Sequence, residues 1–142
     1  MNLRNRTAAV VTGAGALASA LALAAPQASA KVTGIDVAQS TSFGSSNSYG
    51  TGCSYTITAT STGKNVAVVF MDEVNGVKTT ADLNPVGHAV DAQGHASVTW
   101  TPTQAGTHTI YAGDYVSGET YLTTQVTVGT GINLGPVCVV VS

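Results

Sequence analysis

Apolar and polar residues alternate in several short segments of this 142-residue chain. In residues 53–60 every second position is apolar and the four positions between are Ser or Thr. An alternation with period two is typical of a β-strand that has one face toward a core and the other toward water. The same pattern recurs in residues 96–101, 107–112 and 122–128, so these segments are predicted to be strands of the same kind.

Other segments complete the set of predicted strands. Residues 66–71 are apolar at every position, so both faces of the strand are apolar, which indicates a central strand of a sheet. The pair Asn75-Gly76 follows closely and is the preferred sequence of a two-residue type I′ hairpin turn, because both positions require a positive φ. The remaining strands are expected at residues 31–39, 77–83 and 137–141.

Turn residues separate these strands, and they predict the architecture. The breaks fall at the Ser/Gly/Asn-rich residues 40–52, at residues 84–87 and 91–94, and at the Gly-rich connection of residues 129–136. Each sheet has to bury one apolar face, so two antiparallel sheets packed together are the physical solution for seven to eight short strands. The fold class is therefore predicted to be an all-β, immunoglobulin-like β-sandwich.

The composition agrees with this pattern. Residues 31–142 contain 19 Thr, 17 Val and 14 Gly. β-Branched side chains lose rotamer freedom in helices and fit a pleated surface, so no helix is expected. The chain also has Trp100 and five tyrosines, which disordered segments lack, so it is expected to fold.

The N-terminal segment differs from the rest. Arg4 and Arg6 are followed by residues 7–25, which carry no charge, and then by Ala28-Ser29-Ala30. A basic start, an apolar stretch and an A-x-A site are the three parts of a secretory signal peptide. Residues 1–30 are predicted to be that peptide, and residues 31–142 a single domain.

Export also changes the charge of the protein. Residues 31–142 carry three lysines and seven acidic residues, a net charge of −4. Nucleic acids and anionic membranes both attract dense positive charge, so neither is an expected partner. The apolar run at residues 137–141 is too short to cross a bilayer, which takes about 20 residues. No membrane insertion is expected after the signal peptide is removed, and the protein is predicted to be secreted, or loosely associated with the cell envelope.

Two cysteines remain in the exported part. Cys53 and Cys138 form an even pair in a protein that is destined for an oxidising compartment, so a structural disulfide is predicted. Two free buried thiols are the alternative. A redox pair is disfavoured because the C-x-x-C spacing is absent.

Four segments together resemble bacterial immunoglobulin-like domain repeats, the secreted modules found in actinobacteria. They are Tyr-Thr-Ile-Thr-Ala-Thr at 55–60, Val-Ala-Val-Val-Phe-Met-Asp at 66–72, Gly-His-Ala-Ser-Val-Thr-Trp-Thr-Pro at 94–102 and Ala-Gly-Thr-His-Thr-Ile-Tyr-Ala at 105–112. The resemblance implies an extracellular β-sandwich that serves as a spacer, adhesive element or interaction module without catalysis. Two features depart from the family: the domain stands alone, and its cysteines bracket most of the domain.

Candidate catalytic and metal-binding chemistry is weak. His88, His95 and His108 lack the spacing of metal-binding pairs, and His108 falls on a predicted inward face. Asp72 and Glu73 are adjacent, so on a strand they point to opposite faces instead of converging. No G-x-S-x-G turn is present for a serine nucleophile. The chain is predicted not to be an enzyme and to have no metal site and no cofactor.

Two groups of aromatic residues are candidates for binding. Phe43 and Tyr49 stand among Ser, Gly and Asn in residues 40–52, a composition typical of adaptable binding loops, although an ordinary loop is the simpler interpretation. Tyr111, Tyr115 and Tyr121 form a candidate aromatic surface that is able to stack on sugars. Cross-strand packing explains these three equally well.

The predicted function is that of a secreted, non-catalytic binding or adhesion module, whose partner is an extracellular protein or a glycan. The alternative is a small secreted effector, either an enzyme inhibitor or a carrier of an apolar ligand. An inhibitor requires a rigid exposed loop, for which residues 84–91 are the candidate, and a carrier requires a deep apolar cleft between the sheets.

Overall fold

The computed structural model describes residues 31–39, 49–115 and 120–141, together with the backbone of residues 42–44. The predicted signal peptide, residues 1–30, lies outside the described residues. The described part consists of strands and turns and contains no helix. The strands are β1 (Val32–Val37), β2 (Ser42–Gly44), β3 (Tyr49–Gly50), β4 (Tyr55–Ser61), β5 (Ala67–Val74), β6 (Val77–Thr79), β7 (Leu83–Asn84), β8 (Gly87–Ala89), β9 (His95–Trp100), β10 (Gly106–Asp114), β11 (Leu122–Asn133) and β12 (Cys138–Val141).

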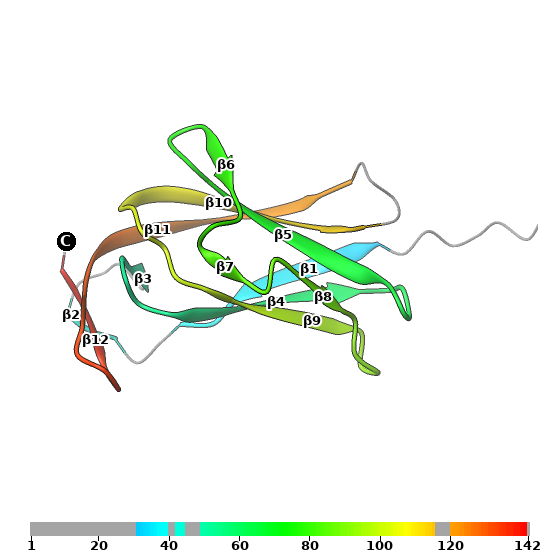
Figure 1. The fold of residues 1–142 in the computed structure, drawn as a ribbon, viewed down its shortest axis with the longest axis horizontal. Coiled ribbons are helices and arrows are strands. Elements are labelled where there is room, and N and C mark those ends of the chain that lie inside the picture. Colours follow the sequence, from blue (N-terminus) through cyan, green and yellow to red (C-terminus); the bar gives the residue numbers. More distant parts are fainter. Residues whose placement is uncertain (1–30, 40–41, 45–48, 116–119, 142) are drawn as a thin grey trace, which may run out of the picture.

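The strands form two sheets that pack face to face (Figure 1). One sheet has the order β1-β4-β9-β7, and the other has the order β2-β12-β11-β10-β5-β6. In the second sheet β3 also pairs with β11, and β8 with β5. The predicted all-β sandwich is confirmed, and the short strands β2, β3, β7 and β8 are additions to the strands that alternation predicted.

The pairing of β4 with β9 shows how alternating apolar and polar residues form one layer of the sandwich. The register sets Ile57 opposite Val98, and both side chains point into the core with exposures of 0% and 2%. On the outer face of the same two strands, Thr58 and Ser97 are hydrogen-bonded through their hydroxyls at 2.9 Å. Each strand therefore has one apolar face and one hydroxyl face, as the period-two pattern predicted.

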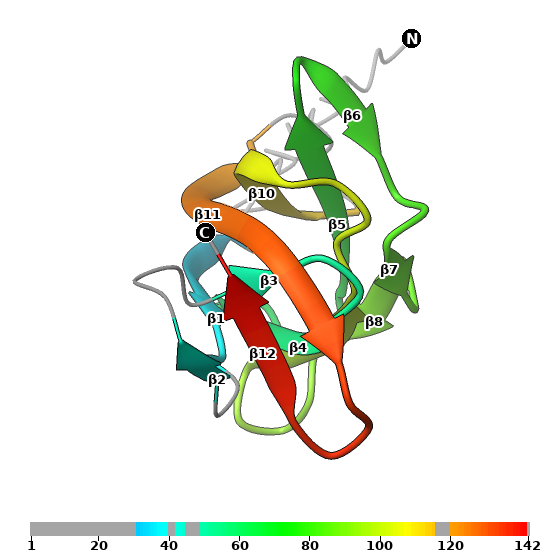
Figure 2. The ribbon, with the colours of Figure 1, turned by 90° about the vertical axis from the view of Figure 1, so that its left-hand side faces the viewer.

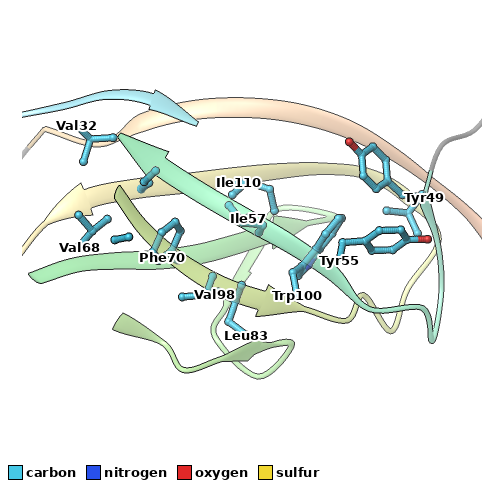
Figure 3. Close-up of a cluster of buried hydrophobic side chains, with 14 of the residues drawn as sticks. Val32, Tyr49, Tyr55, Ile57, Val68, Phe70, Leu83, Val98, Trp100 and Ile110 are labelled. Carbon is cyan, nitrogen blue, oxygen red and sulfur yellow. The ribbon is translucent and has the colours of Figure 1, made fainter. Parts of the chain in front are cut away.

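The core lies between the sheets and is built by both of them (Figure 3). Phe70 and Ile110 come from one sheet, Ile57 and Trp100 come from the other, and all four are fully buried. Burying each side chain of this size stabilises the fold by roughly 1.5–3 kcal/mol. The two sheets are thus joined by a continuous apolar layer.

The hairpin between β5 and β6 has the predicted turn. Asn75 and Gly76 have φ angles of 52° and 75°, the positive values that a type I′ turn requires. Strand β6 is shorter than the predicted return strand of residues 77–83, because the chain leaves it after Thr79 and enters the other sheet as β7.

The prediction of a loop at residues 129–136 is wrong for its first half. Strand β11 continues to Asn133 and pairs there with β12. Gly131 permits this continuation, because a Cβ at its position would collide with the carbonyl oxygen of Thr51 and would lie 2.7 Å from Sγ of Cys53. The glycine that suggested a loop is instead required where β11 passes close to the backbone beside β3 (Figure 2).

Candidate functional site

The predicted disulfide is present. Cys53 and Cys138 are bonded, with their Cα atoms 6.1 Å apart, and both side chains are buried. The bond attaches the C-terminal strand β12 to the chain just before β4, so it closes a loop that contains most of the domain. Closing a loop of this length stabilises a fold by about 4–5 kcal/mol on the chain-entropy model.

Tyr49 does not belong to a binding surface, which corrects the prediction for this residue. Its side chain is 8% exposed, and its hydroxyl donates a hydrogen bond to the carbonyl oxygen of Val37 at 2.7 Å. Its ring contacts the rings of Tyr55 and Trp100 at centroid distances of 5.0 and 5.9 Å (Figure 3). Burial, followed by the negative charge of Asp36, raises the pKa of Tyr49 above its usual value. Tyr49 therefore extends the apolar layer of the core.

Phe43, the other aromatic residue predicted in that loop, lies in β2. The backbone of β2 runs parallel to β12 and sets Phe43 opposite Val139. The side chain of Phe43 lies outside the described part of the structure. A binding role for Phe43 stays a prediction.

The aromatic group on the second sheet is at the surface. Tyr111 and Tyr121 contact each other edge to face, with centroids 6.3 Å apart and an interplanar angle of 80°. Tyr121 is 38% exposed, and Tyr115, just after β10, is 73% exposed. The sequence left cross-strand packing and a surface position as alternatives for these tyrosines. In the structure both occur together, because Tyr111 and Tyr121 pack against each other at the surface.

Tyr111 is held in place by a polar frame from β5 and β6. Its hydroxyl donates to a carboxylate oxygen of Glu73 at 2.7 Å, and Nζ of Lys78 lies 4.2 Å above the ring centroid. Lys78 and Glu73 are 3.8 Å apart, so the acid and the base also form an ion pair. The hydrogen bond to Glu73 is the main reason that the pKa of Tyr111 is raised above its usual value.

A buried polar cluster joins the two sheets, and the sequence analysis missed it. Nε1 of Trp100 on β9 donates to the carboxylate of Asp72 on β5 at 2.9 Å. Nδ1 of His108 on β10 lies 2.8 Å from the same carboxylate, and its Nε2 lies 2.8 Å from the carbonyl oxygen of Gln104. Asp72, His108 and Trp100 are each 0% exposed. Two features of the sequence could have indicated this cluster: Asp72 and His108 each occupy a position of a predicted strand that faces the core.

The other histidines do not join this cluster. His88 and His95 are exposed, and within the described ranges no three His, Cys, Asp or Glu side chains are arranged to hold a metal ion. Oδ1 of Asp91 accepts hydrogen bonds from the backbone N–H groups of Gln93 and His95. These hydrogen bonds lower the pKa of Asp91, and the bond from His95 has the largest effect. The arrangement is that of a solvated turn carboxylate.

Among the surface grooves, two are lined by both polar and apolar side chains. One, of about 460 Å³, lies beside β7 and β9, and its lining includes Ser54, Asp82 and Thr101. The other, of about 300 Å³, lies near Lys64 and Asp91. Leu83 contributes an apolar side chain to the first groove, and Val90 contributes one to the second. Within residues 84–91, the candidate inhibitor loop, Asn84 belongs to β7 and residues 87–89 form β8, which pairs with β5.

No family model matches the chain, and no curated protein matches it. Among solved structures, the chain is similar to a protein described as the D00-D0 domain of Intimin, with a TM-score of 0.52 and 20% sequence identity. The fold is immunoglobulin-like. The similarity covers 69% of this chain and 46% of that one, so this chain spans about half the length of its neighbour.

At this identity the similarity establishes the fold and leaves the function open. The resemblance to actinobacterial repeats remains a prediction at the level of the family. Within the described residues, no helix is long and apolar enough to span a membrane.

Proposed function

We propose that this protein is exported and acts as a non-catalytic, immunoglobulin-like binding module in an adhesive role, with an extracellular or envelope protein or a glycan as its partner. The observation that carries the proposal is the aromatic group at the surface of the second sheet, in which Tyr115 after β10 and Tyr121 before β11 are exposed and Tyr111 on β10 is half-buried. Tyrosine offers a large contact area at a small cost in conformational entropy, which is why binding surfaces favour it.

The rest of the molecule supports that role by being rigid. The space between the sheets is filled by one core cluster, and the disulfide fixes the last strand. A rigid frame loses little conformational freedom when its surface binds a partner, so more of the contact energy appears as affinity.

Export is tested by the form of the protein that leaves the cell. Expressed with its own N-terminus in a bacterial host, the protein is expected in the medium or the envelope fraction with Lys31 as its first residue, as intact mass will show. Alkylation without a reductant should add no label, because Cys53 and Cys138 are bonded to each other. A cytosolic protein that retains residues 1–30 would contradict the proposed export.

Binding is tested with the exported protein immobilised and exposed to extracellular proteins and to arrayed glycans. We expect saturable capture that is weakened when Tyr111, Tyr115 and Tyr121 are changed together to Ser. The matched control changes three exposed threonines of the other sheet, Thr33, Thr56 and Thr99, to Ser. Equal capture by both triple variants would mean that the aromatic group does not bind the partner.

A further inference from the structure

Both ring nitrogens of His108 lie against hydrogen-bond acceptors. Nδ1 lies 2.9 and 2.8 Å from the two carboxylate oxygens of Asp72, and Nε2 lies 2.8 Å from the backbone carbonyl oxygen of Gln104. A carbonyl oxygen and an ionised carboxylate can only accept hydrogen bonds, whereas a neutral imidazole has only one N–H group to donate. A neutral His108 would therefore leave one nitrogen lone pair facing an oxygen lone pair.

Neither a turn of the ring nor solvent removes this conflict. Rotating the imidazole by a half-turn about χ2 would exchange nitrogen for carbon at both positions, so both contacts would be lost. The side chains of His108 and Asp72 are each 0% exposed, so water does not reach between them. The ring needs two N–H groups, one for each acceptor.

The position of the proton within the pair follows from Trp100. Nε1 of Trp100 donates to Oδ2 of Asp72 at 2.9 Å, so one carboxylate lies against both the indole N–H and the imidazole. Hydrogen bonds that are donated to a carboxylate favour its ionised form. The geometry therefore favours an imidazolium beside an ionised carboxylate, a pair with no net charge.

Asp72 is the titratable side chain that the described strands set against the ring. The residues paired with His108 on the neighbouring strands are Val74 and Val126, and the ring of Trp100 on the other sheet lies 5.4 Å away. The charged side chains elsewhere on or beside these elements are exposed, bonded to other groups or at the far end of β10, and they are Asp36, Glu73, Lys78, Asp82 and Asp114. Without the proton, the carboxylate of Asp72 would be a buried charge with no cation beside it among the described residues, which is strongly destabilising.

We propose that His108 carries a proton on both ring nitrogens in the folded protein at neutral pH, and that this proton makes the domain sensitive to alkaline pH. The imidazolium donates from Nδ1 to Asp72 on β5 and from Nε2 to Gln104 in the turn between β9 and β10. The proton thereby fastens that turn to the buried cluster, which also holds Trp100 of the other sheet. This role goes beyond the proposed binding function, because it concerns how the stability of the fold depends on pH.

The direction of the pH effect follows from the proton that folding takes up. In an unfolded chain a histidine gives up its proton near about pH 6.5. Above that pH, folding to the doubly protonated ring has to bind a proton from solvent, so a higher pH opposes folding. The stabilisation by His108 is therefore fully present at low pH and is lost as the pH rises, and loss of the proton releases Gln104 and its turn.

The direct test is an NMR spectrum of the imidazole nitrogens in the isotope-labelled exported protein at about pH 7.5. We expect both nitrogens of His108 in the protonated range, with two ring N–H signals that exchange slowly because the ring is buried. His88 and His95 are exposed and provide the comparison signals in the same spectrum. If either nitrogen of His108 is unprotonated while the protein is folded, the proposal is wrong.

The second test compares the wild type with Asp72→Asn by urea unfolding at several pH values. An asparagine amide can donate to the lone pair of a neutral Nδ1, so the variant keeps both contacts of the ring without the additional proton. From about pH 7 to about pH 8.5, the unfolding equilibrium constant of the wild type is expected to rise more steeply than that of the variant, by up to about tenfold per pH unit. Equal slopes would overturn the proposal. His95→Gln is the matched control, because it removes an exposed histidine and should keep the steeper slope of the wild type.

The two measurements together leave each outcome decisive. If Asp72→Asn does not fold, the imidazole spectrum of the wild type still decides the proposal, because it needs no substitution. An unprotonated Nδ1 combined with a steep slope would place the proton on Asp72 and would overturn its assignment to His108. Each result leaves the proposed binding function as it stands, since that function depends on the outer face of the sheet.

Discussion

Strand β5 carries two neighbouring acids that lead to two different polar clusters. Asp72 points into the sandwich and is fully buried, whereas Glu73 points outward and its side chain is 27% exposed. Each carboxylate accepts a hydrogen bond from an aromatic side chain and lies next to a basic one. The two clusters have the same kinds of members, on opposite faces of one strand.

The inner cluster connects the two sheets. Trp100 belongs to the sheet that contains β4 and β9, whereas Asp72 and His108 belong to the other sheet. No water competes for these groups, so each polar atom depends on its protein partner, and the loss of one leaves another unsatisfied. The cluster therefore fixes how the sheets sit on each other.

The outer cluster stays within one sheet. Glu73, Lys78 and Tyr111 remain partly in contact with water, which replaces any partner that is removed and screens the charges. Its contribution to stability is small, but its members are accessible to a ligand. The comparison shows that burial decides whether such a group supports the fold or is available for binding.

The largest expected effect comes from removing the inner carboxylate. Asp72→Ala takes the partner away from both Trp100 and His108 and should lower the free energy of unfolding by about 3–5 kcal/mol. The outer counterpart, Glu73→Ala, should change it by no more than about 1 kcal/mol. Urea unfolding of both variants measures the difference, and equal losses would mean that burial does not distinguish the clusters.

Double-mutant cycles sharpen the comparison at the level of single hydrogen bonds. Trp100→Phe combined with Asp72→Asn should show a coupling energy of about 1.5–3 kcal/mol, typical of a hydrogen bond to a charged group. The cycle of Tyr111→Phe with Glu73→Gln should show a smaller coupling. A larger coupling energy in the outer cycle would mean that the Tyr111–Glu73 hydrogen bond contributes more to stability than the buried Trp100–Asp72 hydrogen bond.

Ionic strength should also affect the two clusters differently, although the expected change in stability is smaller than in the experiments above. Raising the salt concentration from about 0.01 M to about 1 M shortens the screening length from about 30 Å to about 3 Å. The stability difference between the wild type and Glu73→Ala should shrink over this range, and that between the wild type and Asp72→Ala should change less. Urea unfolding at both salt concentrations tests this, and parallel changes would count against the buried position of Asp72.

The smallest effect is the pH dependence that Tyr111 of the outer cluster contributes. The pKa of Tyr111 is raised in the folded protein, so its contribution is fully present below its unfolded value of 10.0 and is lost as the pH rises through the folded value. Glu73→Gln should bring that pKa back toward 10.0, whereas the pKa of Tyr49, raised mainly by burial, should stay where it is. NMR titration of the tyrosine rings measures both. A pKa of Tyr111 that does not move would exclude Glu73 as the cause.

Alternation predicted most strands because it depends on neighbours along the chain. Residues 53–60 and 96–101 became β4 and β9, and Asn75-Gly76 formed the predicted turn. The prediction was wrong where a residue's role depends on a distant strand. The backbone near Thr51 and Cys53 decides that Gly131 continues β11, and the core decides that Tyr49 is buried.

The candidate site was predicted only in part for the same reason. The sequence pointed to Tyr111, Tyr115 and Tyr121 as aromatic residues close in the chain, but it contained no measure of which rings meet. Their contact depends on the register of β10 against β11, and the ring of Tyr121 lies against Gly113. A one-residue change of register would turn these side chains to the other face.

The sequence by itself determined the all-β class, most strand positions and the opposite directions of Asp72 and Glu73, and it favoured a disulfide between Cys53 and Cys138 over two free thiols. These follow from local periodicity and from the small number of cysteines. Only the tertiary structure decided that Asp72 meets Trp100 and that Tyr121 rests on Gly113, because each contact joins strands whose register and packing are set by the whole core.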